Sequence, residues 1–470
     1  MATETVASGV GFRSERGAIL GALMLATGLV ALDSTIIATA VLTITDTLGG
    51  FAQFPWLFSI YLLAQAVTVP IYGKLADTVG RKPVLMFGIA VFALGSLLCG
   101  LATSMLGLII FRAVQGIGAG AIQPMTMTIA SDLYTLTERA KVQGYLASVW
   151  AMSSVAGPLL GGVFADYVSW RWIFLINLPL SAVAAWMLLR KFSESAPRRK
   201  QQVDYLGAAL LTVGAGALIL GLLEGGQAWA WNSPAGIGIF VGGAVLLVLF
   251  GLVERRAANP ILPLWVFTRR VVIASSLVSV LVGAILVGLT SYVPTFTQGV
   301  LGTGALVAGL TVGALTLGWP IAASQAGKVY LRIGFRATAL IGSGLATVGA
   351  VTTLLIAEDS TLWQIAGSCF VIGIGMGLVA TPTLIAAQTS ADWSERGVVT
   401  SANMFARSIG SAVGVAVFGA IVNSRIGDTD HPLPATLSSA VHLVFITVAV
   451  MAAVMVLASA CMPSRKTVIS

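Results

Sequence analysis

The chain repeats one kind of segment from end to end, a run of about 20 apolar residues followed by a short polar or basic stretch. A helix of this length crosses the roughly 30 Å hydrocarbon core of a lipid bilayer. Strands of a closed membrane barrel would instead alternate in polarity over about ten residues. The continuous runs therefore predict transmembrane helices. We place fourteen of them, at residues 17–42, 53–73, 84–103, 105–128, 142–164, 172–190, 204–223, 235–253, 271–293, 304–325, 335–356, 362–387, 398–421 and 437–461.

Composition excludes the other classes of protein. Charged residues make up 9% and hydrophobic residues 57% of the 470 residues, whereas a soluble domain carries roughly 25% charged residues. A soluble globule of this composition would lack the polar residues to cover its surface. A disordered chain would contain far fewer apolar residues. The predicted fold class is an all-α polytopic membrane protein that lies in the lipid bilayer.

The basic residues are distributed unevenly among the predicted loops. The net charge is +8, from 26 Lys and Arg against 18 Asp and Glu. Lys and Arg collect on the cytoplasmic side of membrane proteins. With the N-terminus inside, 22 basic residues fall in cytoplasmic segments or at their edges, and only Arg171 and Arg425 fall outside. This asymmetry predicts that both termini are cytoplasmic, and it explains the positive charge without a nucleic-acid partner.

The sequence gives no sign of a cleaved leader or of a cofactor. Arg16 precedes the first apolar run as in a signal peptide, but the run is long for a signal, so we expect it to be retained. No pair of Cys, or of Cys and His, has the spacing of a disulfide framework or a metal site. No Gly-x-x-x-x-Gly-Lys-Ser/Thr loop is present. We therefore expect no metal, no cofactor and no direct drive by ATP.

Two sets of residues recur in the second half of the chain, the first 254 positions later and the second 257 positions later. Transporters are often built from such repeated halves. The offset leaves room for the two extra spans at 204–253. The sequence thus predicts a six-helix bundle at 1–200, a two-helix insertion at 201–260 and a second six-helix bundle at 261–470. The matched residues are Gly73, Lys74, Gly80 and Lys82 with Gly327, Lys328, Gly334 and Arg336, and Glu138, Arg139, Gly157 and Gly162 with Glu395, Arg396, Gly414 and Gly419.

Asp33 is the one acidic residue deep inside a predicted span. It lies sixteen residues past the start of the first span, about 24 Å along the helix. A carboxyl group there must face a cavity, pair with a base or become protonated. Burial favours its neutral form, so it could exchange a proton or hold a cationic substrate. The alternative is a helix-end residue at the outer interface. We predict that Asp33 couples proton movement to transport.

Two arginines also lie within spans. Arg112, in the fourth span, would influence the protonation of Asp33 if the two groups border one cavity. Its alternative role is to bond backbone carbonyls and hold its helix in place. Arg407, in the thirteenth span, is either a cavity residue or an arginine that snorkels to the cytoplasmic surface.

Five segments, taken in chain order, resemble motifs of the major facilitator superfamily. Residues 32–37 (Leu-Asp-Ser-Thr-Ile-Ile) are similar to the first-span motif of the 14-span drug–proton antiporters, the QacA-like and EmrB-like group, and residues 170–179 fit the same group. Residues 73–83 resemble motif A and residues 108–120 resemble motif B. Residues 157–162 resemble motif C, the antiporter motif. Thr78 departs from the usual basic residue of motif A, and Ser153 replaces the leading glycine of motif C.

The resemblance implies a fold, a class of activity and roles for these motifs. It implies two six-helix bundles around a central cavity, a secondary-active antiporter that is not an enzyme, a bacterial cytoplasmic (inner) membrane and a monomer. The coupling ion would be the proton. It assigns the cytoplasmic gate to motif A, where the alternative is a plain basic loop. It assigns a seal typical of exchangers to motif C, where the alternative is a generic packing face. The gate residues are Gly73, Asp77, Gly80, Arg81 and Lys82, and the seal residues are Gly157, Pro158, Gly161 and Gly162.

Aromatic and polar residues within the spans are candidates for the substrate cavity, because aromatic rings bind flat hydrophobic cations by stacking and cation–π contact. An interfacial aromatic belt is the alternative for the aromatic members. The candidates are Tyr61, Gln65, Gln115, Tyr292, Gln298 and Arg407.

These features together favour one function. We expect export of hydrophobic, cationic, drug-like compounds in exchange for protons, by alternating access of a midplane site. A lipid, a siderophore or another endogenous metabolite is the alternative cargo. Nutrient symport is disfavoured by the antiporter-type motif. A transport-inactive scaffold is disfavoured because the soluble segments are short.

Overall fold

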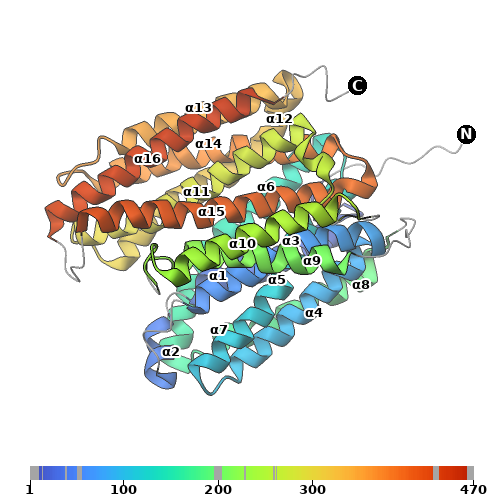
Figure 1. Cartoon of the computed structure of the whole chain (residues 1–470), viewed down its shortest axis with the longest axis horizontal. Helices are drawn as coiled ribbons and strands as arrows, with labels where there is room; N and C mark the ends of the chain where they lie inside the picture. The colour runs from blue at the N-terminus through green and yellow to red at the C-terminus, as the bar shows by residue number, and fades with distance from the viewer. Residues whose placement is uncertain are drawn as a thin grey trace, which may run out of the picture. The chain divides into compact units, whose positions relative to one another are not determined.

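The computed structural model describes residues 10–462 except 13, 38–39, 50–55, 195–203, 227–228, 258–259, 261 and 427–432. This part of the chain is almost entirely helical (Figure 1). The α-helices are α1 (Gly17–Ile36), α2 (Val41–Leu48), α3 (Trp56–Val79), α4 (Arg81–Gly100), α5 (Met105–Leu133), α6 (Leu136–Val163), α7 (Trp172–Leu175), α8 (Asn177–Lys191), α9 (Tyr205–Glu224), α10 (Pro234–Glu254), α11 (Arg270–Gly299), α12 (Ala305–Ile333), α13 (Phe335–Thr353), α14 (Leu362–Thr389), α15 (Arg396–Ile426) and α16 (Pro434–Ala460). Three short helices of other types are η3 (Phe164–Val168), η4 (Leu264–Phe267) and η5 (Trp393–Glu395).

Twelve helices of the described chain are long and apolar enough to cross a membrane, with α7 and α8 together forming one of them. The chain is therefore a multi-pass helical membrane protein, as predicted. The predicted number of fourteen spans is not reached. The predicted spans 142–164 and 204–223 do form helices, α6 and α9, but neither is among the twelve. The described apolar part of α9 covers only Leu206–Leu222, and α6 opens with charged residues in its first turns.

The chain divides into two compact units, one of residues 1–65 and 75–200 and one of residues 66–74 and 201–470. In the first unit α1 packs against α6 and α8, and α4 packs against α5 and α8. In the second unit α14 packs against α12 and α13, α11 packs against α15 and α16, and α9 pairs with α10. The predicted division into a bundle at 1–200, an insertion at 201–260 and a bundle at 261–470 stays a prediction. This includes the prediction that the α9–α10 pair is a separate insertion.

The internal repeat appears in the backbone before α4 and before α13. Gly80 precedes α4 with φ +106°, and its predicted counterpart Gly334 precedes α13 with φ +89°. These angles lie in the region that glycine adopts readily and other residues rarely adopt. Both sharp turns between consecutive helices therefore require glycine, which explains why this position recurs in the sequence.

The repeat also appears as a matched ion pair. Arg16 donates from Nη1 to the Leu133 carbonyl at 2.6 Å and to Glu138 Oε2 at 3.2 Å. In the second unit, Arg269 donates from Nη1 to the Ser390 carbonyl at 3.1 Å and to Glu395 Oε2 at 3.1 Å. Glu138 and Glu395, which were matched from the sequence, therefore make the same kind of ion pair, each within its own half of the chain.

Candidate functional site

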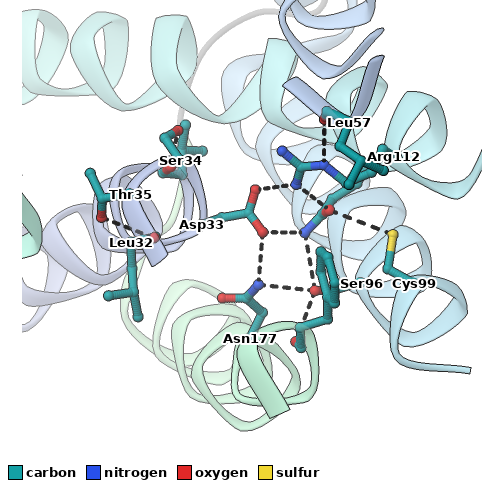
Figure 2. A network of polar contacts seen from close by, with 12 residues as sticks. Leu32, Asp33, Ser34, Thr35, Leu57, Ser96, Cys99, Arg112 and Asn177 are labelled. Carbon is teal, nitrogen blue, oxygen red and sulfur yellow. Dashed lines mark hydrogen bonds and ion pairs between the residues drawn. The ribbon is translucent and has the colours of Figure 1, made fainter. Parts of the chain in front are cut away.

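A buried polar network surrounds Asp33 in the first unit (Figure 2). Asp33 lies in the last turn of α1 with 1% of its surface exposed. Its Oδ2 accepts a hydrogen bond from Arg112 Nη1 at 2.6 Å. Its Oδ1 accepts from Gln115 Nε2 at 2.7 Å and from Asn177 Nδ2 at 3.3 Å. Asp33 is therefore an ion-paired carboxylate inside the bundle, which does not fit an exposed residue at the membrane interface.

Arg112 is held on several sides. Its Nε donates to the Leu57 carbonyl of α3 at 3.1 Å, and Nη1 also donates to Gln115 Oε1 at 2.8 Å. The guanidinium lies 4.1 Å from the centre of the Tyr61 ring. Arg112 therefore both bonds a backbone carbonyl and pairs with Asp33, and its influence on the protonation of Asp33 stays a prediction. Removing one member of such a buried pair leaves an uncompensated charge, at a cost of about 3–5 kcal/mol.

Ser96 and Asn177 complete the network, and neither has a role predicted from the sequence. Ser96 Oγ accepts from Asn177 Nδ2 at 2.9 Å and from Gln115 Nε2 at 3.1 Å, and it donates to the Phe174 carbonyl at 2.9 Å. Asn177 could have been identified as a candidate, because it belongs to segment 170–179, which resembles the 14-span antiporters. Ser96 carries no comparable signal, because a serine in an apolar run is equally compatible with simple packing.

An apolar cluster adjoins the network and restricts the access of water. It contains Leu57, Cys99 and Phe174, which contact the network, together with residues from α1, α2, α4 and α5. Arg112 and its partners therefore lie in a setting of low polarity, where electrostatic interactions are stronger than in water. The cluster consists of Ile36, Ile37, Ala40, Ile44, Leu57, Cys99, Ala102, Met105, Leu108, Trp170, Ile173 and Phe174.

The predicted gate residues form a second charged cluster at the start of α4. Arg81 pairs through Nη2 with Asp77 Oδ1, another of the predicted gate residues, at 2.8 Å, and through Nε with Asp132 Oδ2 of α5 at 3.1 Å. Arg81 is 1% exposed. Asp132 was missed, because nothing in the sequence relates the end of α5 to the end of α3. Gly73 lies in the part of α3 that belongs to the second unit, outside this cluster.

Glu194 is a further missed member of this gate cluster. Its Oε1 accepts from the Arg81 backbone N–H at 2.8 Å and its Oε2 from the Lys82 backbone N–H at 3.0 Å. Lys82 in turn donates from Nζ to the carbonyls of Leu189 and Phe192 at the end of α8. The carboxylate thus satisfies N–H groups at the start of α4 that have no partner within the helix.

The residues of the predicted antiporter motif lie near the end of α6. Gly157 contacts Thr35 of α1 so closely that a Cβ atom would clash with Oγ1 of Thr35. Thr35 donates a hydrogen bond from Oγ1 to the Ser153 carbonyl at 2.9 Å. Gly161 is buried, whereas Gly162 has open space where a side chain would lie. The side chain of Pro158 lies outside the described residues. Close packing of α6 on α1 therefore depends on Gly157.

The six cavity candidates are divided between the two units, with Tyr61, Gln65 and Gln115 in the first and Tyr292, Gln298 and Arg407 in the second. Tyr61 and Gln115 are buried in the Arg112 network, 2% and 0% exposed. In the second unit Tyr292 packs edge-on against Phe418, and Gln298 bonds only within its own helix among the described contacts. Gln65 and Arg407 are partly buried. A cavity of about 760 Å³ in the second unit is lined by residues 354–359, Arg425 and the first turns of α16, and it includes none of the six.

Long apolar helices with a charged network buried among them define a polytopic membrane protein of the transporter class. The chain belongs to the Major Facilitator Superfamily, whose sequence profile matches residues 23–415. Multidrug resistance protein 3 of Bacillus subtilis (strain 168) is 36% identical over 405 residues, 86% of this chain and 78% of that protein. Multidrug transporter protein MdtP of the same organism is 35% identical over 426 residues, 90% and 79% of the two chains.

A solved structure supports the fold. The human organic anion transporter MFSD10 (TETRAN) superimposes with a TM-score of 0.68 at 15% identity, over 95% of this chain and 99% of that one. Family membership makes the protein a membrane transporter and not an enzyme.

Proposed function

We propose that this protein is a proton-coupled efflux transporter. It exports hydrophobic, cationic, drug-like compounds in exchange for protons, by alternating access. The observation that carries the proposal is the fully buried ion pair between Asp33 and Arg112. Buried charges inside a membrane are costly and commonly mark ion pathways. The names of the two bacterial relatives as multidrug proteins support the direction of transport and the class of cargo.

The coupling step follows from the chemistry of the pair. A proton that reaches Asp33 neutralises the carboxylate and removes its attraction to Arg112. The helices that carry the two side chains, α1 and α5, are then no longer held together by this ion pair. Each proton that moves down a potential of 100 mV supplies about 2.3 kcal/mol to the conformational cycle, in which the pair alternates between its two states.

The proposal extends to topology and location. We propose that α6 and α9 also cross the membrane, which gives the fourteen spans of the QacA-like and EmrB-like group, with both termini in the cytoplasm of a bacterial cell and the chain in its cytoplasmic membrane. The distribution of basic residues supports this orientation. The 28-residue length of α6 also supports a crossing, since it exceeds the roughly 20 residues that a span requires.

Transport by the purified protein in proteoliposomes tests the proposal. With a pH gradient imposed across the membrane, we expect wild-type protein to move an ethidium-like cation against its own gradient. Asp33→Asn should lower this gradient-driven transport at least roughly a hundredfold, because a neutral amide cannot exchange the proton. The matched control is Asp46→Asn, which alters an exposed acid on α2 and should behave as wild type. Wild-type coupling in Asp33→Asn would refute the role of Asp33. Transport of neutral lipid alone would favour the alternative cargo.

A further inference from the structure

Asn177 joins the Asp33 network from the first residue of α8. Its side chain is fully buried. The short helix α7 ends at Leu175, two residues before Asn177, and the Phe174 carbonyl of α7 accepts a hydrogen bond from Ser96 of α4 at 2.9 Å. This contact ties the start of α8 to α4. Asn177 is thereby fixed beside Asp33, although the two residues are far apart in the sequence.

The two ends of the Asn177 carboxamide have different surroundings. Nδ2 faces Asp33 and Ser96 and donates to both, at 3.3 Å and 2.9 Å. Oδ1 points away from Asp33 in Figure 2, and it is buried with no hydrogen-bond partner among the described residues. A buried acceptor without a donor is unfavourable and rare in proteins. The oxygen therefore holds an unused capacity to accept a hydrogen bond next to the proposed proton site.

Gln115 also donates to Asp33, but it has no such capacity. Its Nε2 donates to Asp33 and Ser96, while its Oε1 accepts from Arg112 Nη1 and from the Cys99 thiol. Turning the Gln115 amide would place its N–H₂ group against the Arg112 guanidinium, which can only donate. Of the two amides on Asp33, only that of Asn177 can exchange its ends.

We propose that Asn177 is a positioning residue that responds to the protonation of Asp33. The inference rests on the proposed function of Asp33 in proton coupling. A carboxylate only accepts hydrogen bonds, whereas a protonated carboxyl also donates one. When a hydronium ion transfers a proton to Oδ1 of Asp33 and leaves as water, the Asn177 carboxamide turns by half a rotation. Its Oδ1 then accepts from the new O–H group, and loss of the proton to water on the other side reverses the turn.

The surroundings allow this rotation. The oxygen and the nitrogen of a carboxamide are nearly equal in size, and the terminal torsion is soft. The Ser96 hydroxyl can rotate from the Phe174 carbonyl to the turned oxygen and donate to it, so its hydrogen bond to α7 is exchanged during the turn. The ionisable groups that interact with Asp33 are Arg112 from α5, Tyr61 from α3 and Cys99 from α4. Asp33 is the only ionisable residue of α1, and those of α8 lie in its last turn, so no further charge opposes the movement.

Two variants test the inference, with the full chain in proteoliposomes. Asn177→Leu keeps the approximate shape but neither donates nor accepts. We expect gradient-driven export to fall about tenfold while substrate binding changes less than twofold. The infrared C=O band of protonated Asp33 should move to higher frequency, because its O–H group loses the acceptor. Asn177→Asp is the second variant, and it replaces the leucine variant in the test if that variant does not fold. It places a second carboxyl group beside that of Asp33. It should move the pH profile of export to higher pH.

The controls separate this inference from the proposed function. Ser181→Ala lies one turn further along α8, is also buried and makes no described contact with Asp33, so it should leave both the band and the pH profile unchanged. If Asp33→Asn keeps wild-type coupling, the proposed function fails. Suppose instead that Asp33→Asn abolishes coupling. If the infrared band then stays in place in Asn177→Leu, or the pH profile stays in place in Asn177→Asp, only the inference about Asn177 fails.

Discussion

Arg112 shows how a single side chain connects three helices of the first unit, its own helix α5 with α1 and α3. Its planar guanidinium bonds the Leu57 carbonyl of α3 and Asp33 of α1 at the same time, and its face lies against the Tyr61 ring. Only a rigid fork with several donors meets these demands at once, and Gln115 adds a third acceptor. The charge of this residue and its shape are therefore separate requirements.

Replacing Arg112 with lysine separates these two requirements. Arg112→Lys keeps the positive charge but has a single donor centre, so it cannot reach both the Leu57 carbonyl and Asp33. Because a hydrogen bond to a charged group contributes about 1.5–3 kcal/mol, we expect gradient-driven export to fall at least roughly tenfold. Transport assays in proteoliposomes measure this. Arg190→Lys, at an exposed position of α8, is the control. Full activity of Arg112→Lys would mean that charge alone is needed.

The residues that the sequence predicted and those that it missed differ in a physical way. Asp33 and Arg112 could be predicted because a charge in an apolar run is conspicuous and must find a partner. Ser96, Asp132 and Glu194 could not, since serine is common in spans and acids are common near span ends. Their roles depend on which helices lie next to one another, and the spacing of residues along one chain does not encode that arrangement.

The element that best shows the difference between the two halves is the turn into the third long helix of each half, α4 in the first and α13 in the second. In the first half the turn before α4 carries the Asp77–Arg81 pair. In the second half Phe335 occupies the place of Arg81, and its ring stacks on Tyr330 with centres 4.8 Å apart. The glycine of the turn is kept in both. The backbone geometry is thus repeated, while the charged cluster is present in one half.

The start of α4 gives a prediction for Glu194. Its carboxylate accepts from two backbone N–H groups at the helix N-terminus, where negative charge is favourable. Glu194→Gln removes the charge and leaves one accepting oxygen for two donors. We expect a loss of about 1–2 kcal/mol in stability, similar to the loss of a helix cap. Thermal unfolding in detergent measures it, with Glu15→Gln at an exposed position as control. An unchanged unfolding temperature would mean that water replaces the carboxylate at no cost.

At the scale of the whole molecule, the fold class followed from apolar runs alone, and the number of spans did not. Run length is set by the bilayer, so it is visible in the sequence. Whether α6 and α9 cross the membrane is less visible. α6 carries Glu138, Arg139 and Lys141 in its first turns, and the described apolar part of α9 is short. Sidedness resolves the question, because each additional crossing reverses the side of every later loop.

The cysteines of the chain allow a direct measurement of sidedness. Cys99 and Cys369 are buried and Cys461, just after α16, is exposed. We expect a membrane-impermeant maleimide to label the wild-type protein at Cys461 in inside-out vesicles and not in right-side-out vesicles.

In a Cys461→Ser background, Tyr167→Cys after α6 and Asn232→Cys after α9 should be labelled only from outside. Thr137→Cys in the first turn of α6 and Arg255→Cys after α10 should be labelled only from inside. These four positions are exposed in the structure. Labelling of Thr137→Cys and Tyr167→Cys from the same side would exclude α6 as a span. Labelling of Asn232→Cys from inside would exclude α9.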